Sequence, residues 1–218
     1  MQRSFHKLYW NDRCSNWGFE MGRAQTFDTD RVVRAALGVF WRSGYEAASV
    51  PALEEATGLN RSSIYHAFGS KRGLFDAAVQ AYLDDVVRPR LRTLTDDTVD
   101  HPDPDAVVRY FTGLRAALAA TGEIQADSGC LLVNASGAPI ARDPAVRRVV
   151  ADYRAELRAA LGRGVDARYP GRPAAERDRL ADLCTALVVS AFALVRVDPD
   201  SATGALDGAL ELLGAGGH

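Results

Sequence analysis

Hydrophobic residues recur with the period of an α-helix along most of the chain. From Asp28 onward they return every three or four positions, as Val33, Leu37 and Phe40 do, so that they share one face of a helix. No stretch of useful length alternates between apolar and polar residues as a half-buried strand would. The pattern predicts an all-α protein.

Three short helices are predicted close together near the start of this region. Each is opened by a residue whose side chain commonly caps a helix, and each is followed by a glycine that can end it. They are expected from Thr29, as the cap, to about Arg42 before Gly44; over Val50–Ala56 between Ser49 and Gly58; and over Arg61–Phe68 between Asn60 and Gly69.

A longer helix is expected to start at Ser70, and Pro89 is expected to kink or end it. A polar, proline-containing link over 95–105 follows. Further helices are predicted near 105–121, 129–138, 144–163, 175–196 and 201–213. We therefore expect a helical head over 23–75 and a larger helical body over 76–218.

Residues 1–22 differ from the rest of the chain. They hold two of the three tryptophans and show no sustained helical period. We expect this extension to be disordered. Because Met21 begins a segment that looks like a natural start, we interpret the extension as sequence upstream of the true start; a genuine N-terminal arm is the alternative.

Composition and charge set limits on the class of protein. Hydrophobic residues make up 47% and charged residues 25%, as in an ordinary globular protein. No apolar run reaches the roughly 18–20 residues of a membrane span, and no signal peptide is evident, so a cytoplasmic protein without a membrane partner is expected. Cys14, Cys130 and Cys184 are widely spaced, which argues against a disulfide framework. The net charge of −2 would not by itself suggest a nucleic-acid partner.

The three-helix arrangement describes a helix-turn-helix, in which a tight turn locks two helices together and the last helix is slim enough to enter a major groove about 12 Å wide. The segment GYEAASVPALEEATGLNRSSIYHAFGSKRGLF (Gly44–Phe75) resembles the N-terminal domain of the TetR family of bacterial transcriptional regulators. The resemblance is strong over about 29–80. Two departures stand out: Leu53-Glu54 replaces a frequent Ile-Ala, with Glu54 free to face solvent, and His66-Ala67 shifts the family's histidine by one position.

The resemblance implies a set of DNA-contacting residues. Arg61 is the best candidate for a base edge, because a guanidinium can bind guanine through two hydrogen bonds. Tyr65 and Lys71 are expected to contact phosphate; Lys71 lies in a first helical turn, where the helix dipole disfavours a cation. Packing or plain solvent exposure is the alternative for each residue. The full set is Thr29, Ser49, Arg61, Ser62, Ser63, Tyr65, His66 and Lys71.

For the body, the resemblance implies a ligand pocket and a pair of C-terminal helices that form a homodimer. The wide apolar arc of the last two helices fits such pairing, although burial within a monomer is the alternative. The expected interface is Leu180, Cys184, Leu187, Val188, Ala191, Phe192, Leu206 and Leu210. Candidate pocket residues are Tyr110, Phe111, Cys130 and Tyr153, which are equally good core residues.

We expect a ligand-responsive transcriptional regulator, a repressor that a small molecule releases from a palindromic double-stranded operator. The alternatives are a dimeric adaptor without specific DNA binding and a thiol-based redox sensor that uses Cys130. No cofactor or metal is expected. An enzyme is disfavoured because no histidine is placed on an apolar helix near Cys130 to serve as its base, and no HExxH, GxSxG or P-loop pattern occurs.

Overall fold

The computed structural model describes residues 28–95, 103–120 and 128–214, and every regular element in these residues is helical. The predicted extension over 1–22 and most of the link over 95–105 lie outside them. The elements are α1 (Thr29–Ala47), α2 (Val50–Thr57), α3 (Arg61–Phe68), α4 (Lys71–Tyr82), the π-helix η1 (Leu83–Val87), α5 (Arg88–Thr95), α6 (Ala106–Ala119), α8 (Leu131–Ser136), the 3-10 helix η2 (Pro139–Arg142), α9 (Pro144–Arg168), α10 (Ala174–Leu194) and α11 (Pro199–Leu212). The expected all-α fold is confirmed.

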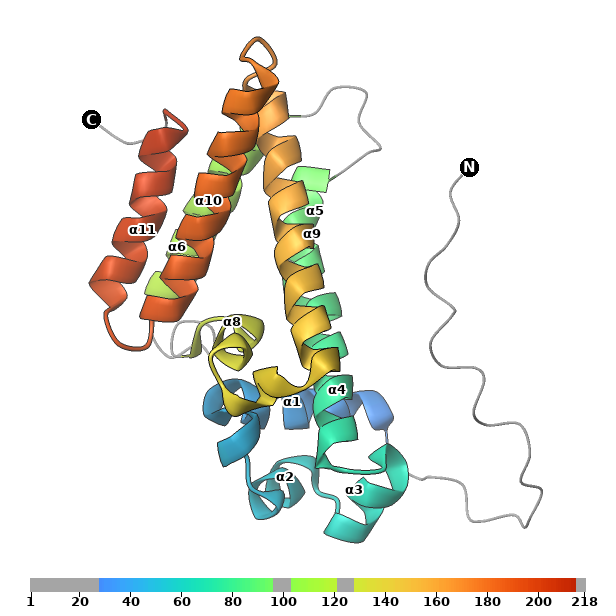
Figure 1. Ribbon diagram of the computed structural model, residues 1–218. Helices are drawn as coiled ribbons and strands as arrows, with labels where there is room; N and C mark the ends of the chain where they lie inside the picture. The colour runs from blue at the N-terminus through green and yellow to red at the C-terminus, as the bar shows by residue number, and fades with distance from the viewer. Residues whose placement is uncertain (1–27, 96–102, 121–127, 215–218) are drawn as a thin grey trace, which may run out of the picture.

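The helices form a small head and an elongated body (Figure 1). Helices α1, α2 and α3 make the head at one end of the molecule. From there α4, η1 and α5 run into the body beside α9, while α10 and α11 lie side by side on the opposite flank with α6. The rod α4–η1–α5 therefore belongs to both parts.

The helix starts follow the predicted capping residues with one exception. Ser49, Asn60 and Ser70 each accept a hydrogen bond from a first-turn backbone N–H. The prediction that Thr29 caps α1 is wrong. Asp28 is the cap, because its carboxylate accepts from the N–H groups of Asp30 and Arg31, and Thr29 is already helical.

Pro89 does not end its helix, contrary to one of the two expectations. The rod continues into α5, and the turn just before the proline is the π-helix η1. Proline lacks an N–H group and its ring crowds the carbonyl four residues earlier, so a wider π turn at this point relieves that conflict. The disruption predicted from Pro89 is present, but it is absorbed within a continuous rod.

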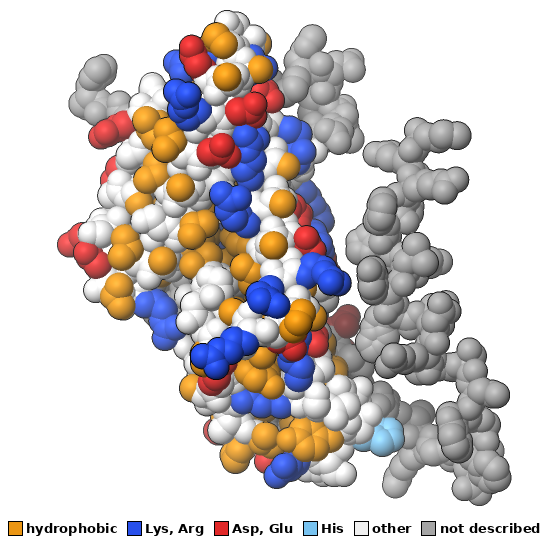
Figure 2. Space-filling model, in the orientation of Figure 1, with side chains coloured by type: hydrophobic (Ala, Val, Ile, Leu, Met, Phe, Trp, Pro, Cys, Tyr) orange, Lys and Arg blue, Asp and Glu red, His pale blue; other side chains and the backbone are white. Residues whose placement is uncertain are grey.

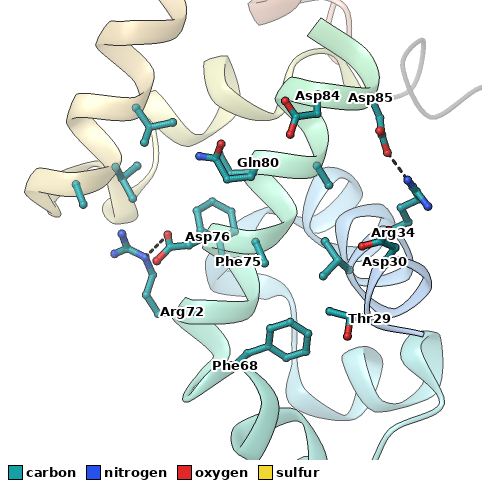
Figure 3. A pocket seen from close by; sticks show the side chains of 18 of the residues that line it. Thr29, Asp30, Arg34, Phe68, Arg72, Phe75, Asp76, Gln80, Asp84 and Asp85 are labelled. Carbon is teal, nitrogen blue, oxygen red and sulfur yellow. Dashed lines mark hydrogen bonds and ion pairs between the residues drawn. The ribbon is translucent and has the colours of Figure 1, made fainter. Parts of the chain in front are cut away.

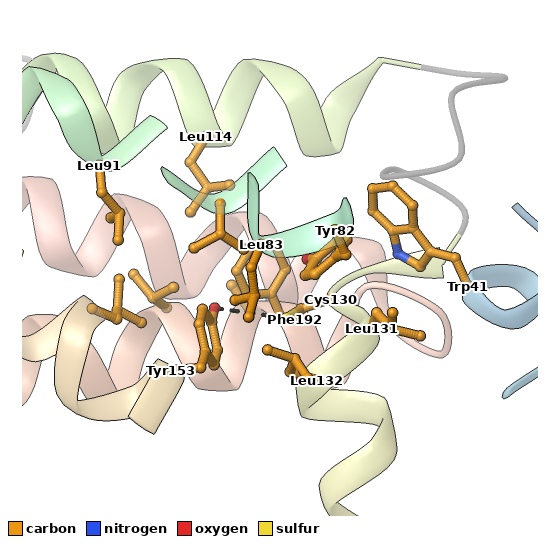
Figure 4. Close-up of a cluster of buried hydrophobic side chains, with 14 of the residues drawn as sticks. Trp41, Tyr82, Leu83, Leu91, Leu114, Cys130, Leu131, Leu132, Tyr153 and Phe192 are labelled. Carbon is orange, nitrogen blue, oxygen red and sulfur yellow. Dashed lines mark hydrogen bonds between the residues drawn. The ribbon is translucent and has the colours of Figure 1, made fainter. Parts of the chain in front are cut away.

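One hydrophobic core runs from the head into the body. In the head, the Phe75 ring makes edge contacts with Phe40 at 5.2 Å and Tyr45 at 5.1 Å between centroids. At the junction, Trp41 meets Tyr82 edge-on at 4.8 Å, beside Cys130 (Figure 4). Aromatic pairs of this kind contribute about 0.5–1.5 kcal/mol beyond the area they bury. The head is thus packed onto the body.

Polar contacts also join the head to the segment around α8 and the start of α9. The Trp41 indole Nε1 donates to the Gly129 carbonyl at 2.8 Å in a buried position. The Ile140 backbone N–H donates to Glu46 Oε1 at 2.7 Å, and the Arg72 guanidinium forms a two-point ion pair with Asp143, the cap of α9. Contacts from α1 and from α4 therefore converge on the same part of the body.

Candidate nucleic-acid interface

The turn between α2 and α3 is built by local hydrogen bonds. Gly58 ends α2 with a φ of 72°, a left-handed conformation that glycine adopts without strain. Asn60 Oδ1 then accepts from the Ser63 N–H at 2.8 Å and starts α3. Leu53 and Ile64, each only 1% exposed, anchor the two helices in the head core. The result is the tight helix-turn-helix that the sequence predicted.

Glu54 lies at this turn and is engaged there. Its Oε1 accepts a hydrogen bond from the Arg61 N–H, the first N–H group of α3, at 2.5 Å. The Glu54 side chain is half-buried, whereas its neighbour Glu55 is exposed. Glu54 is thus partly exposed, in keeping with the expectation that it can face solvent, but its side chain also reaches across the turn.

The outer face of α3 carries the predicted contact residues. Arg61, Ser62 and His66 are exposed, and Ser63 is half-buried. The Arg61 guanidinium carbon lies 5.2 Å from the centre of the Tyr65 ring, so these two candidates form a cation–π pair on one face of the helix. The structure thus brings the cation and the phenol together on the surface that would meet DNA.

Lys71 has partners within the head. Its Nζ lies 4.7 Å from the centre of the Tyr45 ring and donates to the Glu46 carbonyl at 3.4 Å. Partial burial lowers the pKa of Lys71, and Glu46 opposes that shift. The carbonyl near the end of α1 and the aromatic face give a local reason for a lysine here, which the sequence alone did not reveal.

The two remaining head candidates lie at other helix ends. Ser49 is exposed and caps α2 by accepting from the Ala52 N–H at 3.2 Å. Thr29 is exposed at the first position of α1. It lines an open groove of about 880 Å³ between α1, α4 and the start of α9, beside the Arg34–Asp85 and Arg72–Asp76 ion pairs (Figure 3).

The predicted ligand-binding residues lie in the core of the body. Phe111 and Cys130 are fully buried, and Tyr153 is 6% exposed. The Cys130 thiol lies 3.6 Å from the Tyr153 hydroxyl (Figure 4). Burial raises the pKa of Tyr110 and that of Tyr153, for which Cys130 is a second cause. These groups are neutral phenols at physiological pH.

A small hollow adjoins this cluster. It measures about 20 Å³, close to the space that one water molecule needs. Tyr110 and Tyr153 line it, together with Tyr82, Arg90 and Phe192. Sequence reasoning missed Tyr82 and Arg90 as pocket residues, because a helical period identifies buried positions without showing which of them surround a space.

Most of the predicted interface residues are buried within the single chain. Leu187 and Leu210 are partly exposed. The others are covered by the protomer itself and need no partner to bury them: Leu180, Cys184, Val188, Ala191, Phe192 and Leu206. Leucines that sequence reasoning left off the interface, Leu183 and Leu212, are 45% and 44% exposed.

No group of three or more His, Cys, Asp or Glu side chains in the described part of the chain could hold a metal ion. Within the same residues, no helix is both long enough and apolar enough to cross a membrane.

Curated relatives match the head most clearly. The model of the family "Bacterial regulatory proteins, tetR family" matches residues 32–78. The HTH-type transcriptional repressor ComR of Escherichia coli (strain K12) is 43% identical over 63 residues, which are 29% of this chain and 30% of ComR. The chain thus matches less than a third of the length of ComR. The HTH-type transcriptional repressor BdcR of the same organism is 25% identical over 187 residues, 86% of this chain and 90% of BdcR.

Solved structures extend the likeness to the body. A cysteine mutant of the TetR family transcriptional regulator CifR, complexed with 26bp double-strand operator DNA, has a TM-score of 0.69 at 29% identity, over 87% of this chain and 98% of that one. A TetR transcriptional regulator from Chloroflexus aurantiacus has a TM-score of 0.66 at 27% identity, over 84% and 90% of the two chains. The head of this chain therefore matches the helix-turn-helix domain of the TetR family, and the described part of the chain is similar in fold to TetR-family transcriptional regulators.

Proposed function

We propose that the protein is a dimeric repressor that binds a palindromic operator and leaves it when a small molecule enters the body. The observation that carries the proposal is the outer face of α3, where Arg61, Ser62 and His66 are exposed while Ile64 holds the helix in the head core. A recognition helix needs this division, because its base contacts must be free and its orientation fixed. ComR and BdcR, both repressors by name, support the direction of regulation.

We assign the head residues by what their side chains can bind. Arg61 is assigned to a base edge, and Ser62, Ser63 and His66 to bases or phosphates beside it. Tyr65 and Lys71 are assigned to phosphate; Lys71 donates one hydrogen bond to Glu46, so two of its three N–H donors remain for a DNA oxygen. Ser49 lies at the start of α2, where backbone N–H groups favour phosphate. At the start of α1 the Asp28 carboxylate takes two of those N–H groups, so Thr29 is assigned to phosphate through its own hydroxyl.

The homodimer would form through the outer faces of α10 and α11. Leu183, Ala186 and Ala193 follow one another along the exposed side of α10, and Gly204 and Leu212 lie on that of α11. Figure 2 shows hydrophobic side chains over the later part of α10 and over α11, whereas charged side chains gather over α9, over the start of α10 and at the edges of α11. Small and apolar residues allow two helix pairs to approach closely, which favours pairing here.

The effector would enter the body beside Tyr110 and Tyr153. A hollow of about 20 Å³ is too small for any effector larger than water, so binding would push helices apart. Tyr82 and Leu91 line the hollow from the rod that continues into the head. A ligand that binds the opened body would thereby favour a different placement of the head.

Selection of a duplex from a random library, followed by footprinting, tests the proposal. We expect an imperfect palindrome whose half-sites lie about 34–36 Å, or a multiple of that distance, apart. A footprint by one protomer on a single asymmetric half-site would contradict it. Failure to select any duplex, with salt-dependent binding to random DNA also absent, would instead support the adaptor.

A further inference from the structure

The first turn of the recognition helix is occupied by the chain's own acceptors. Glu54 Oε1 accepts from the Arg61 N–H at 2.5 Å, and Asn60 Oδ1 accepts from the Ser63 N–H at 2.8 Å. Asn60 is the local cap of α3, but Glu54 belongs to α2 and reaches across the turn of the motif. Its carboxylate is therefore both a clamp between the two helices and a negative charge at the start of α3.

A free helix start would attract phosphate. Its N–H groups point outward and carry partial positive charge, and such contacts position a protein on DNA without reading its sequence. The Glu54 carboxylate takes one of these donors and repels an approaching phosphate. Arg61 lies at the same turn with its side chain exposed. The Arg61 guanidinium therefore remains available to a DNA groove, whereas two backbone N–H groups at the start of α3 are already occupied.

We propose that Glu54 is a specificity-determining residue of the DNA-binding head. Its carboxylate lowers affinity for DNA of any sequence by denying phosphate the start of α3, while the clamp holds Arg61 in place to read a base. The affinity for the operator is thereby raised relative to the affinity for random DNA. The inference rests on the proposed function insofar as α3 is the helix that enters the major groove.

Two variants, each of which replaces one glutamate with neutral glutamine, separate this role from the general effect of removing a negative charge. Glu54→Gln keeps an amide oxygen that can accept from the Arg61 N–H, but it removes the charge. Glu55→Gln makes the same chemical change at the next residue, which is exposed. Affinities are measured for the duplex that the wild type selects from a random library and for a scrambled duplex of the same composition.

We expect Glu54→Gln to bind the scrambled duplex about 3- to 10-fold more tightly, the size of one nearby charge in water, and to gain less on the selected duplex. The ratio of the two affinities should fall by about 3-fold or more. Glu55→Gln should shift both affinities by one small, common factor. A thermal midpoint of Glu54→Gln close to that of the wild type shows that the clamp persists.

Two results would overturn the inference. One is that Glu54→Gln changes both affinities by the same factor, as Glu55→Gln does. The other is that it weakens binding to the selected duplex alone, because the carboxylate would then contact a base rather than repel phosphate. If Glu54→Gln unfolds at lower temperature, Glu54→Asp, which keeps the charge on a shorter side chain, must retain low affinity for the scrambled duplex. A wild type that binds neither duplex contradicts the proposed function instead.

Discussion

At the scale of single residues, Arg61 and Lys71 are both cations of the head, but they are held differently. Arg61 is exposed on the outer face of α3 over the Tyr65 ring, whereas Lys71 is half-buried between the Tyr45 ring and the Glu46 carbonyl. A guanidinium on the recognition helix suits a base edge, and an ammonium at the edge of the head suits a phosphate. Their substitutions should therefore have different signatures.

We expect Lys71→Ala to weaken binding to the selected and scrambled duplexes together. It should also flatten the dependence of log affinity on log salt by roughly 0.9 per lost phosphate contact in each protomer.

Arg61→Ala should relax the preference at one base pair in each half-site by about 1–3 kcal/mol, beyond some general loss of affinity. Titrations at several salt concentrations, on the operator and its single-base variants, check both. Base preference altered by Lys71→Ala, with a uniform loss for Arg61→Ala, would reverse the two roles.

What the sequence could predict at this scale was local. Ser49, Asn60 and Ser70 are short side chains that cap the helix immediately after them, so adjacency in sequence was enough. Asp28 and Thr29 both fit the capping pattern, and only the backbone geometry separates them. Glu54 caps α3 from seven residues away with a long side chain, and no spacing rule for caps contains that contact.

At the scale of elements, α9 runs further than its sequence suggests. The hydrophobic pattern predicts a helix near 144–163, where glycines follow, yet α9 extends to Arg168. Gly164 explains the difference. A Cβ at this position would lie 2.9 Å from Leu94 Cδ2 and 2.9 Å from Val107 Cβ, so the missing side chain allows α9 to approach α5 and α6 closely. A glycine that serves packing looks, in sequence, like one that breaks a helix.

We expect Gly164→Ala to destabilise the protein by about 1–3 kcal/mol, because Leu94 and Val107 would have to move in a well-packed core. Gly113→Ala is the matched control: it lies within α6 and a Cβ there would meet nothing within 4 Å. Alanine's higher helix propensity should make that variant more stable by up to about 1 kcal/mol. Urea denaturation of both variants measures the difference, and equal stabilisation would show that α9 does not need the close approach.

At the scale of the whole molecule, a residue buried inside one protomer cannot contact a second protomer, so the dimer interface has to be formed by exposed residues. Phe192 is 6% exposed and packs inside the chain, so a charge there should unfold the protomer. Leu183 on α10 is 45% exposed, so the folded monomer should tolerate an arginine at this position. We expect Leu183→Arg to sediment as a folded monomer with weak operator binding. Wild type that is monomeric at micromolar concentration, or Leu183→Arg that remains dimeric, would contradict this interface.

The head and body are also joined by a charged contact whose pH dependence can be worked out. The Arg72 guanidinium lowers the pKa of Asp143 from 3.8 to about 2. A carboxylate with a lowered folded pKa stabilises the fold above its unfolded pKa, and this contribution is lost as the pH falls through about 2. The contact should therefore be fully formed, and its effect independent of pH, from pH 5 to pH 8.

Asp143→Asn isolates this contact, because asparagine still caps α9 at the Ala145 and Val146 N–H groups but cannot form the ion pair. We expect its urea midpoint to fall below that of the wild type by the same amount at pH 5 and pH 8, and the gap to close as the pH is lowered from 4 toward 2. Asp28→Asn makes the same change at the cap of α1, which accepts only from backbone N–H groups, and should shift the midpoint less. A gap for Asp143→Asn that persists unchanged at pH 2 would show that capping or packing, rather than the Arg72 ion pair, joins the head to α9 here.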